Sequence, residues 1–205
     1  MMDKKNKVVA ITGSIGSGKS TVAEYIKSKG FPVINTDDKA KELMVTDQKV
    51  IKAIKKEFGD DIYNDQVELN KQKLADLVFG EDKESQEMLA RLNALVHPAV
   101  IDFLIAEVRR LEEKGEALVF VESALVFEAQ LEEGFDYIIT VYLDEETSIR
   151  RAAERINEPV EAIRKRMANQ ISPESKKGHA DFVIDNSGSK EDAEKSVDFL
   201  LTILA

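Results

Sequence analysis

Residues 13 to 20 have the side chains and the spacing of a phosphate-binding loop. They read Gly13-Ser14-Ile15-Gly16-Ser17-Gly18-Lys19-Ser20, which is the pattern G-x-x-x-x-G-K-S. Glycines allow positive φ and a close approach to a ligand, so that backbone N–H groups can cradle phosphate oxygens. Lys19 is placed to reach the β- and γ-phosphates of a nucleotide, and the hydroxyl of Ser20 can ligate Mg²⁺. A glycine-rich turn that binds nothing would need neither Lys19 nor Ser20.

Two acidic residues stand where predicted strands end. Asp37 lies just past the run Pro32–Asn35, and Glu122 closes the apolar run Leu118–Glu122. Ligands of open parallel sheets bind beyond the carboxyl ends of the strands. A carboxylate at position 37 could orient an attacking hydroxyl and accept its proton, although position alone favours a helix cap. Glu122 has the position of a Walker B acid, which holds Mg²⁺ or its water shell.

A basic segment interrupts an acidic chain. The 205 residues have a net charge of −10, yet residues 147 to 177 hold eight basic side chains against four acidic ones. Arg151 and Arg155 are four residues apart, so they share one face of a helix and could clamp a phosphoryl group. Arg166 and Gln170 have the same spacing on the next helix. The alternative is a solvated helical face of mixed charge.

Other polar positions have a structural explanation of their own. His97 precedes Pro98 among apolar neighbours, which is typical of a residue at a helix end. His179 has no second ligand candidate nearby, so no structural metal site is predicted. The residues Asp185-Asn186-Ser187-Gly188 follow the last predicted strand, where a turn is sufficient to explain them.

The elements that must position these residues are those of an α/β protein. Short apolar runs separated by helical patterns predict a mostly parallel sheet. The runs are Val8–Thr12, Pro32–Asn35, Leu118–Glu122, Tyr137–Leu143 and Phe182–Ile184. The first run leads directly into the phosphate-binding pattern, and a helical spacing follows that pattern. Strand, glycine-rich turn and helix is the arrangement that the motif requires.

About eighty residues separate the second and third predicted strands, far more than one crossover helix needs, so an inserted helical region is expected. Its first helices are predicted at Lys39–Val45, Gln48–Phe58 and Lys71–Phe79, the last of them capped by Asn70. The amphipathic stretch Ser85–Lys114 contains Pro98 and therefore predicts two helices that meet at Val96-His97-Pro98.

The basic segment predicts a helical hairpin, and one more helix follows the last strand. The hairpin comprises Thr147–Ile156 and Val160–Ile171, with Pro173 ending its second helix. The final helix is predicted at Lys190–Leu204.

Composition narrows the class of protein. A hydrophobic fraction of 43% is sufficient for a sizeable core, and the absence of cysteine excludes disulfides and thiol catalysis. A cytoplasmic enzyme is expected, because the N-terminus has no signal-peptide pattern and no run of 18 apolar residues predicts a membrane span. The acidic net charge argues against a nucleic-acid partner. No obligate protein partner is indicated.

Taken in order, these motifs resemble the dephospho-CoA kinase family over almost the whole chain. The matching segments are Ile11–Ala23, Asn35–Asp37, Leu92–Pro98, Leu125–Glu128, Arg151, Arg155, Arg166 with Gln170, and Ala180–Gly188. Many families share a phosphate-binding loop, but this ordered set is specific. The chain departs from the family pattern at several positions, chiefly Asn35, Glu122, Ala124 and Ser148.

The resemblance implies the fold and its division. The fold would be a three-layer P-loop NTPase core with a five-stranded parallel sheet, a helical substrate-binding insertion and a helical lid. The core would comprise residues 1–37, 116–146 and 178–205. Residues 38–115 would form the CoA-binding insertion, and residues 147–177 the lid, all within a single kinase domain.

The resemblance also implies the reaction, which is ATP-dependent phosphorylation of the ribose 3′-hydroxyl of dephospho-CoA with Mg²⁺. The implied catalytic residues are Asp37, Lys19, Arg151 and Arg155. The implied ATP site comprises Gly13, Gly16, Ser17, Gly18, Lys19, Ser20, Thr21, Asn186 and Gly188. The implied substrate contacts are Asp37, His97, Glu128 and Arg166, and the implied metal-side residues are Ser20 and Glu122.

Three other functions are compatible with parts of the sequence. Another small-molecule or nucleoside monophosphate P-loop kinase would share the core but predicts a shorter insertion. A GTP-dependent switch needs an Asn-Lys-x-Asp element, and neither Asn6-Lys7 nor Asn70-Lys71 is followed by that aspartate. A non-catalytic nucleotide-binding protein stays open because of the departures from the family pattern.

Overall fold

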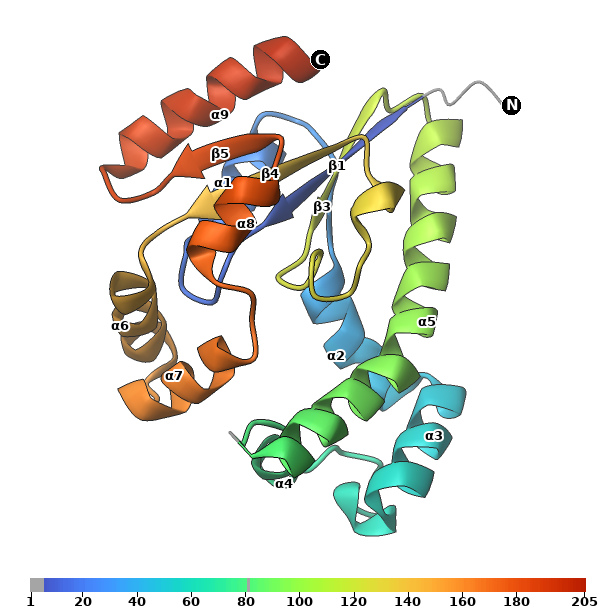
Figure 1. The fold of residues 1–205 in the computed structure, drawn as a ribbon. Coiled ribbons are helices and arrows are strands. Elements are labelled where there is room, and N and C mark those ends of the chain that lie inside the picture. The colour runs from blue at the N-terminus through green and yellow to red at the C-terminus, as the bar shows by residue number, and fades with distance from the viewer. Residues whose placement is uncertain (1–5, 81) are drawn as a thin grey trace. The chain divides into compact units, whose positions relative to one another are not determined.

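The computed structural model describes residues 6–80 and 82–205. Its centre is a five-stranded parallel sheet with the strand order β2-β3-β1-β4-β5 (Figure 1). The strands are β1 (Lys7–Thr12), β2 (Val33–Asn35), β3 (Leu118–Glu122), β4 (Tyr137–Tyr142) and β5 (Phe182–Asp185). The central strands β1 and β3 are buried nearly throughout, which explains why they read as continuous apolar runs rather than alternating ones.

Helices cover both faces of this sheet. On one face, α1 (Lys19–Ser28) and α9 (Lys190–Leu204) pack on alternate residues of the central strands, among them Val9, Ile11 and Phe120. On the other face, Ala10 and Ile138 pack with Val126 and Phe127 from the segment that follows β3. Successive strand residues thus serve opposite faces, as the pleat requires, and the result is a three-layer α/β arrangement.

Three helices lie between β4 and β5 in the chain. They are α6 (Glu145–Ile156), α7 (Val160–Ala168) and α8 (Pro173–His179), and a short 3₁₀ turn at Glu132–Gly134 precedes β4. Ile149, Ala152, Ile163 and Met167 of α6 and α7 form a small apolar cluster. This cluster also receives the side chain of Ile15 from the loop after β1.

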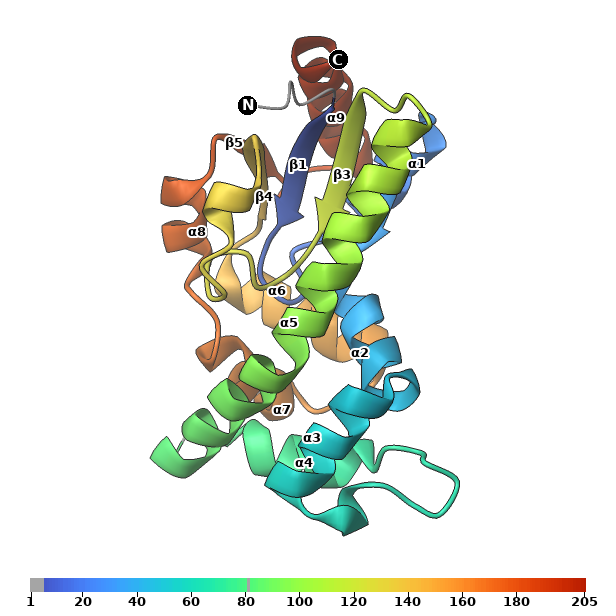
Figure 2. The same cartoon turned by 90° about the vertical axis from the view of Figure 1, so that its right-hand side faces the viewer.

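Residues 36 to 106 form a separate compact unit. It contains α2 (Thr36–Thr46), α3 (Gln48–Phe58), a 3₁₀ turn at Asp60–Ile62, α4 (Lys71–Val78) and most of α5 (Lys83–Glu113). Its own core includes the fully buried side chains of Ile54, Ile62 and Val78. The other compact unit comprises residues 6–35 and 107–205 of the part that the structure describes. Figure 2 shows the same elements from a second side.

Local sequence signals place most element boundaries correctly. All five predicted strands are confirmed to within one residue at each end, and α3 and α9 have the predicted bounds. Asn70 is confirmed as the cap of α4, since its side-chain oxygen accepts a hydrogen bond from the amide of Lys73. The prediction for α2 was too short, because this helix begins at Thr36 directly after β2.

The predicted break at Pro98 was wrong, because α5 continues through this residue as one helix of 31 residues (Figure 1). A proline inside a helix removes one N–H donor and clashes with the carbonyl four residues earlier, at a cost of about 3 kcal/mol. Burial of apolar side chains on both sides of Pro98 offsets that cost. Leu92 and Val96 are buried in the core of the 36–106 unit, and Ala99 and Val100 pack against that core.

The prediction that Pro173 ends a helix was also wrong. Helix α7 stops at Ala168, and Pro173 is the first residue of α8. Proline is favoured at this position, because the first helical N–H has no partner within the helix and φ is already helical. Ser172 caps α8 by accepting a hydrogen bond from the amide of Ser175.

By length and composition, α5 is apolar enough to cross a membrane, which the sequence analysis did not anticipate. A single such helix is weak evidence for a membrane span, because a core helix of a non-membrane protein passes the same test. Only 11% of the apolar 18-residue window of this helix is buried inside the structure. Leu92 and Val96 belong to one apolar core, and Leu111 near the helix end is buried.

Candidate active site

The phosphate-binding loop joins the central strand β1 to α1. Gly18 has φ of 94° and directly precedes the helix, so the loop ends where the helix presents its unpaired N–H groups. Gly16 also has positive φ, and a Cβ there would overlap the carbonyl oxygen of Ser148 in α6. These two glycines are therefore required both by backbone conformation and by close packing.

Ser20, Glu122 and Asn35 meet at the carboxyl ends of the strands. Glu122 is the last residue of β3, lies in register with Asn35 of β2, and is only 4% exposed. Its Oε1 accepts a hydrogen bond of 2.6 Å from the Ser20 hydroxyl, and its Oε2 accepts one of 2.9 Å from the Asn35 amide. The two residues predicted to lie on the metal side are thus brought together. Asn35 orients the carboxylate from the other side.

The turn after β5 contacts the phosphate loop. The Asn186 side chain donates a hydrogen bond of 2.8 Å to the Ser17 carbonyl, and Arg151 donates one of 3.2 Å to the Asn186 carbonyl. Gly188 lies two residues further along this exposed turn. Hydrogen bonds from the hydroxyl and amide of Ser187 lower the pKa of the Asp185 carboxyl, so the turn is internally fixed.

The predicted lid arginines have different environments. Arg151 lies beside the loop through its contact with Asn186, and Arg155 lies one helical turn further along α6 with its side chain exposed. Arg166 is in α7 and forms an ion pair of 2.7 Å with Glu158. Arg151 and Arg155 lie on α6, the helix whose Ser148 carbonyl abuts Gly16, so both belong to the helix that packs against the phosphate loop.

Glu128 forms a buried polar cluster with Lys176 of α8. The Lys176 side chain is 0% exposed, and its Nζ lies 2.8 Å from Glu128 Oε1 and donates a 2.7 Å hydrogen bond to the Ala124 carbonyl. The same Glu128 oxygen accepts a hydrogen bond from the amide of Ile171. Lys176 was counted within an exposed or phosphate-facing basic segment, and that interpretation was wrong for this residue. Its charge is neutralised inside the protein.

Asp37 and His97 belong to the 36–106 unit. Asp37 lies in the first turn of α2, two residues beyond the end of β2, and is not the residue that precedes the helix. His97 is in the middle of α5, not at a helix end. Burial lowers the pKa of the His97 imidazole below its usual value, which favours the neutral ring.

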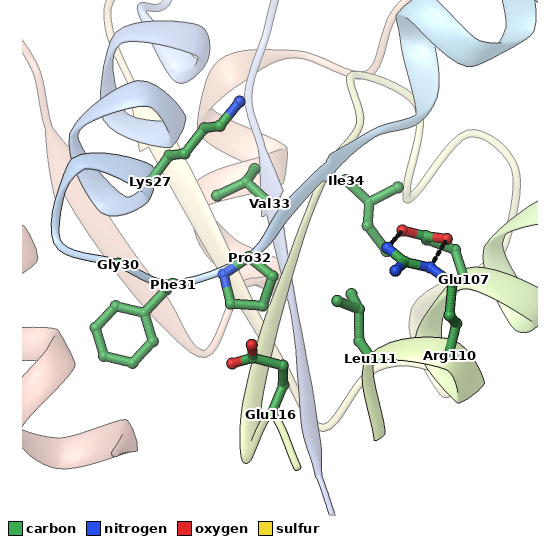
Figure 3. Close-up of a pocket in the computed structure, with 10 residues that line it drawn as sticks. All are labelled: Lys27, Gly30, Phe31, Pro32, Val33, Ile34, Glu107, Arg110, Leu111 and Glu116. Carbon is green, nitrogen blue, oxygen red and sulfur yellow. Dashed lines mark hydrogen bonds and ion pairs between the residues drawn. The ribbon is translucent and has the colours of Figure 1, made fainter. Parts of the chain in front are cut away.

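A separate hollow of about 390 Å³ lies near the start of β2 (Figure 3). It is lined by Phe31, Pro32 and Leu111 together with charged residues. Figure 3 shows the Arg110 guanidinium facing the Glu107 carboxylate, and the two form a salt bridge that neutralises the cation. The cations that line this hollow, Lys27 and Arg110, are accompanied by Glu107 and Glu116, and the hollow does not include the glycine-rich backbone of residues 13–20.

Sequence reasoning missed several contacts of the site. Gln170 was noted for its spacing from Arg166 and as part of the family resemblance, but no partner was predicted for it; its side-chain oxygen accepts a hydrogen bond of 3.0 Å from the Ile15 amide of the phosphate loop. Asn35 was noted as a departure from a family pattern, not as a partner of Glu122. No local signal marks these pairs, because the partners are 155 and 87 residues apart in the chain.

The fold has known counterparts. A solved Thermus thermophilus protein is 34% identical, covers 98% of this chain and 100% of its own, and superimposes with a TM-score of 0.81. A dephospho-CoA kinase from Campylobacter jejuni, 24% identical, shares the fold with a TM-score of 0.59 over 98% of both chains. A central parallel sheet, a G-x-x-x-x-G-K-S loop and an acid at the end of the neighbouring strand define a P-loop nucleotide-binding protein.

Sequence comparison gives the family. A dephospho-CoA kinase from Listeria monocytogenes serotype 4b is 37% identical over 191 residues, which are 93% of this chain and 94% of the relative. The family model for dephospho-CoA kinase matches residues 7–192. The chain belongs to the dephospho-CoA kinase family.

Proposed function

We propose that this protein transfers the γ-phosphate of ATP to the 3′-hydroxyl of dephospho-CoA, giving coenzyme A and ADP. Family membership supports the reaction. The observation that carries the proposal is the meeting of the loop's Ser20 with Glu122 at the carboxyl end of the sheet. In the reaction, the 3′-oxygen attacks the γ-phosphorus, the bond to the β,γ-bridging oxygen breaks, and the hydroxyl proton leaves to a base.

The nucleotide would lie on the loop at residues 13–20. Backbone N–H groups of Gly16, Ser17, Gly18 and the first turn of α1, including Thr21, would hold phosphate oxygens. Lys19 would carry its charge to the β- and γ-phosphates. Gly13 allows the loop to leave β1 next to the Val141 backbone, where a side chain would clash. Asn186 and Gly188 would border the base, in a turn already bonded to Ser17.

Mg²⁺ would be held by the Ser20 hydroxyl and the Glu122 carboxylate. Hard oxygen donors of this kind suit Mg²⁺, which usually keeps several waters and takes few ligands from the protein. Within residues 6–80 and 82–205 there is no group of three or more His, Cys, Asp or Glu side chains that could hold a metal on its own. When bound, the ion would neutralise charge on the phosphates.

Arg151 and Arg155 would neutralise charge that develops on the transferring phosphoryl group. Asp37 would hold the incoming 3′-hydroxyl in line and accept its proton. His97, Arg166 and Glu128 would contact the acceptor. Glu128 keeps a second carboxylate oxygen, Oε2, that is buried with no hydrogen-bond partner and could receive a donor from that molecule.

Each segment of the chain is assigned one part of the function. We assign nucleotide binding to the core at residues 1–37, 116–146 and 178–205, acceptor binding to the helical region 38–115, and closure over the nucleotide to residues 147–177. Closure would exclude water, which otherwise competes with the 3′-hydroxyl for the phosphoryl group.

The test is an ADP-release assay with ATP and Mg²⁺, in which dephospho-CoA is compared with AMP, shikimate and adenosine. We expect turnover with dephospho-CoA only. Asp37→Asn should lower kcat by about a hundredfold or more, the usual scale for a general base, while binding of an ATP analogue stays unchanged.

Asp38→Asn is the matched control, because it makes the same change at the next residue of α2. It should retain most of the activity. Turnover with another acceptor in preference to dephospho-CoA would refute the substrate assignment. Full activity of Asp37→Asn would refute the role of Asp37.

A further inference from the structure

The phosphate loop is joined to the 147–177 segment by three separate contacts. The backbone amide of Ile15 donates a hydrogen bond of 3.0 Å to Gln170 Oε1. The Ile15 side chain packs against the apolar cluster of α6 and α7. The Cα of Gly16 lies so close to the Ser148 carbonyl that no Cβ could be accommodated. The loop that should hold ATP therefore does not stand apart from these helices.

Gln170 belongs to a connector, residues 169–172, that is itself fastened. This connector joins α7 to α8 (Figure 1). The amide of the next residue, Ile171, donates a hydrogen bond to Glu128 Oε1. Lys176 of α8 forms an ion pair with the same oxygen. Lys176 also donates to the Ala124 carbonyl. Two successive connector residues are thus bonded to the loops that follow β1 and β3.

We propose that Gln170 is a positioning residue for phosphoryl transfer. Its amide oxygen fixes the orientation of the Ser14–Ile15 peptide in the phosphate loop, and the Glu128–Lys176 pair fixes the connector that carries Gln170. Because the same connector joins α7 to α8, movement of the 147–177 segment is transmitted to the loop. This inference rests on the proposed function for the identity of the nucleotide.

The chemistry of the side chain is part of the inference. Gln170 offers an acceptor that carries no charge, next to a loop that must hold several negative charges. A carboxylate would make the same hydrogen bond with Ile15 but would repel the phosphates. The hydrogen bond and the charge can therefore be tested separately at one position.

The experiment compares Gln170→Glu and Gln170→Met with Asn169→Asp. Asn169 is the matched control, because it precedes Gln170 in the connector but bonds to the Lys165 carbonyl and not to the phosphate loop. Three quantities are measured: the dissociation constant of a fluorescent ATP analogue without acceptor, kcat and KM for ATP, and the melting temperature.

We expect Gln170→Glu to weaken binding of the analogue about tenfold through charge repulsion, with kcat at saturating ATP nearly kept. Gln170→Met, which has a similar shape but no comparable acceptor, should lower kcat about five- to tenfold and increase ATP hydrolysis without acceptor, on the scale of one lost hydrogen bond. Asn169→Asp should change neither quantity more than twofold, and melting temperatures should stay close to that of the parent.

Two outcomes would overturn the inference. One is a Gln170→Met protein that binds the analogue and turns over as the parent does. The other is a loss of binding or activity in the Gln170 variants that only follows a lowered melting temperature or is matched by Asn169→Asp. The analogue titration needs no acceptor, so it still decides the role of Gln170 if dephospho-CoA proves to be the wrong substrate.

Discussion

Asn35 and Glu122, the last residues of β2 and β3, are hydrogen-bonded to each other. An aspartate at position 35 would face the buried Glu122 carboxylate at the 2.9 Å that now separates Asn35 Nδ2 from Glu122 Oε2. Two carboxylates at such a distance cannot both ionise without a cation between them. The amide of Asn35 removes this repulsion and leaves one carboxylate facing Ser20.

Asn35→Asp should therefore make stability depend on Mg²⁺. In EDTA we expect a loss of about 1–2 kcal/mol, because a favourable hydrogen bond becomes a like-charge contact, and Mg²⁺ should restore much of it. The measurement is thermal unfolding with and without Mg²⁺. Asn169→Asp, an amide-to-acid change away from Glu122, is the control. If Mg²⁺ stabilises Asn35→Asp no more than it stabilises the parent, the added carboxylate does not share a cation with Glu122.

Helix α8 carries a buried charge at Lys176. Its Lys176 side chain is fully buried and bonds to Glu128 and to the Ala124 carbonyl. A charge at such a site is stable only while its partners remain, since removal of one partner leaves the other charge buried and uncompensated. The Lys176–Glu128 pair thus joins α8 to the segment after β3.

Single replacements of this pair should be costly, and the double replacement less so. We expect Glu128→Gln and Lys176→Met each to lower the free energy of unfolding by about 3–5 kcal/mol. The combination of Glu128→Gln with Lys176→Met should recover a large part of that loss. Urea unfolding measures all four proteins. Additive losses in the double variant would contradict this account.

Taken as one chain, the protein carries a net charge of −10 but must gather cations around a polyphosphate. It does so locally, because Lys19 begins α1 and Arg151 contacts the turn beside the loop. Lys176 does not contribute, because it is buried and paired with Glu128. The helical region 36–106 has its own core and is a compact unit by itself. Two ligands bound to different units should therefore slow amide hydrogen exchange in different segments of the chain.

Hydrogen exchange should show this difference. An ATP analogue should slow amide exchange in the loop at residues 13–21 and in the turn at 185–188, because both would border the nucleotide. Dephospho-CoA should slow exchange within residues 38–106. Helix α9 packs on one face of the sheet. Amide exchange in α9 serves as an internal control and should change little. Protection by dephospho-CoA confined to residues outside 38–115 would contradict the assignment of acceptor binding to that region.

The sequence by itself determined the strands, most helices and the phosphate-binding loop. These features depend on local properties: apolar runs for buried strands, helical spacing for helices, and glycine, lysine and serine at fixed intervals for the loop. Errors arose where tertiary contacts override local preference. Apolar packing along α5 carries the helix through Pro98, and the interior site of Lys176 cannot be read from a basic segment.

Only the tertiary structure decided which side chains meet. Ser20 and Glu122 are 102 residues apart, and Ile15 and Gln170 are 155 apart, so no periodicity in the chain links them. Strand order brings the first pair together, because β1 lies beside β3 although a long helical region separates them in sequence. Packing of α6, α7 and α8 at the carboxyl end of the sheet brings the second pair together. Parallel strands separated by crossovers place sequence-distant residues at one edge, and this is why the site required the fold.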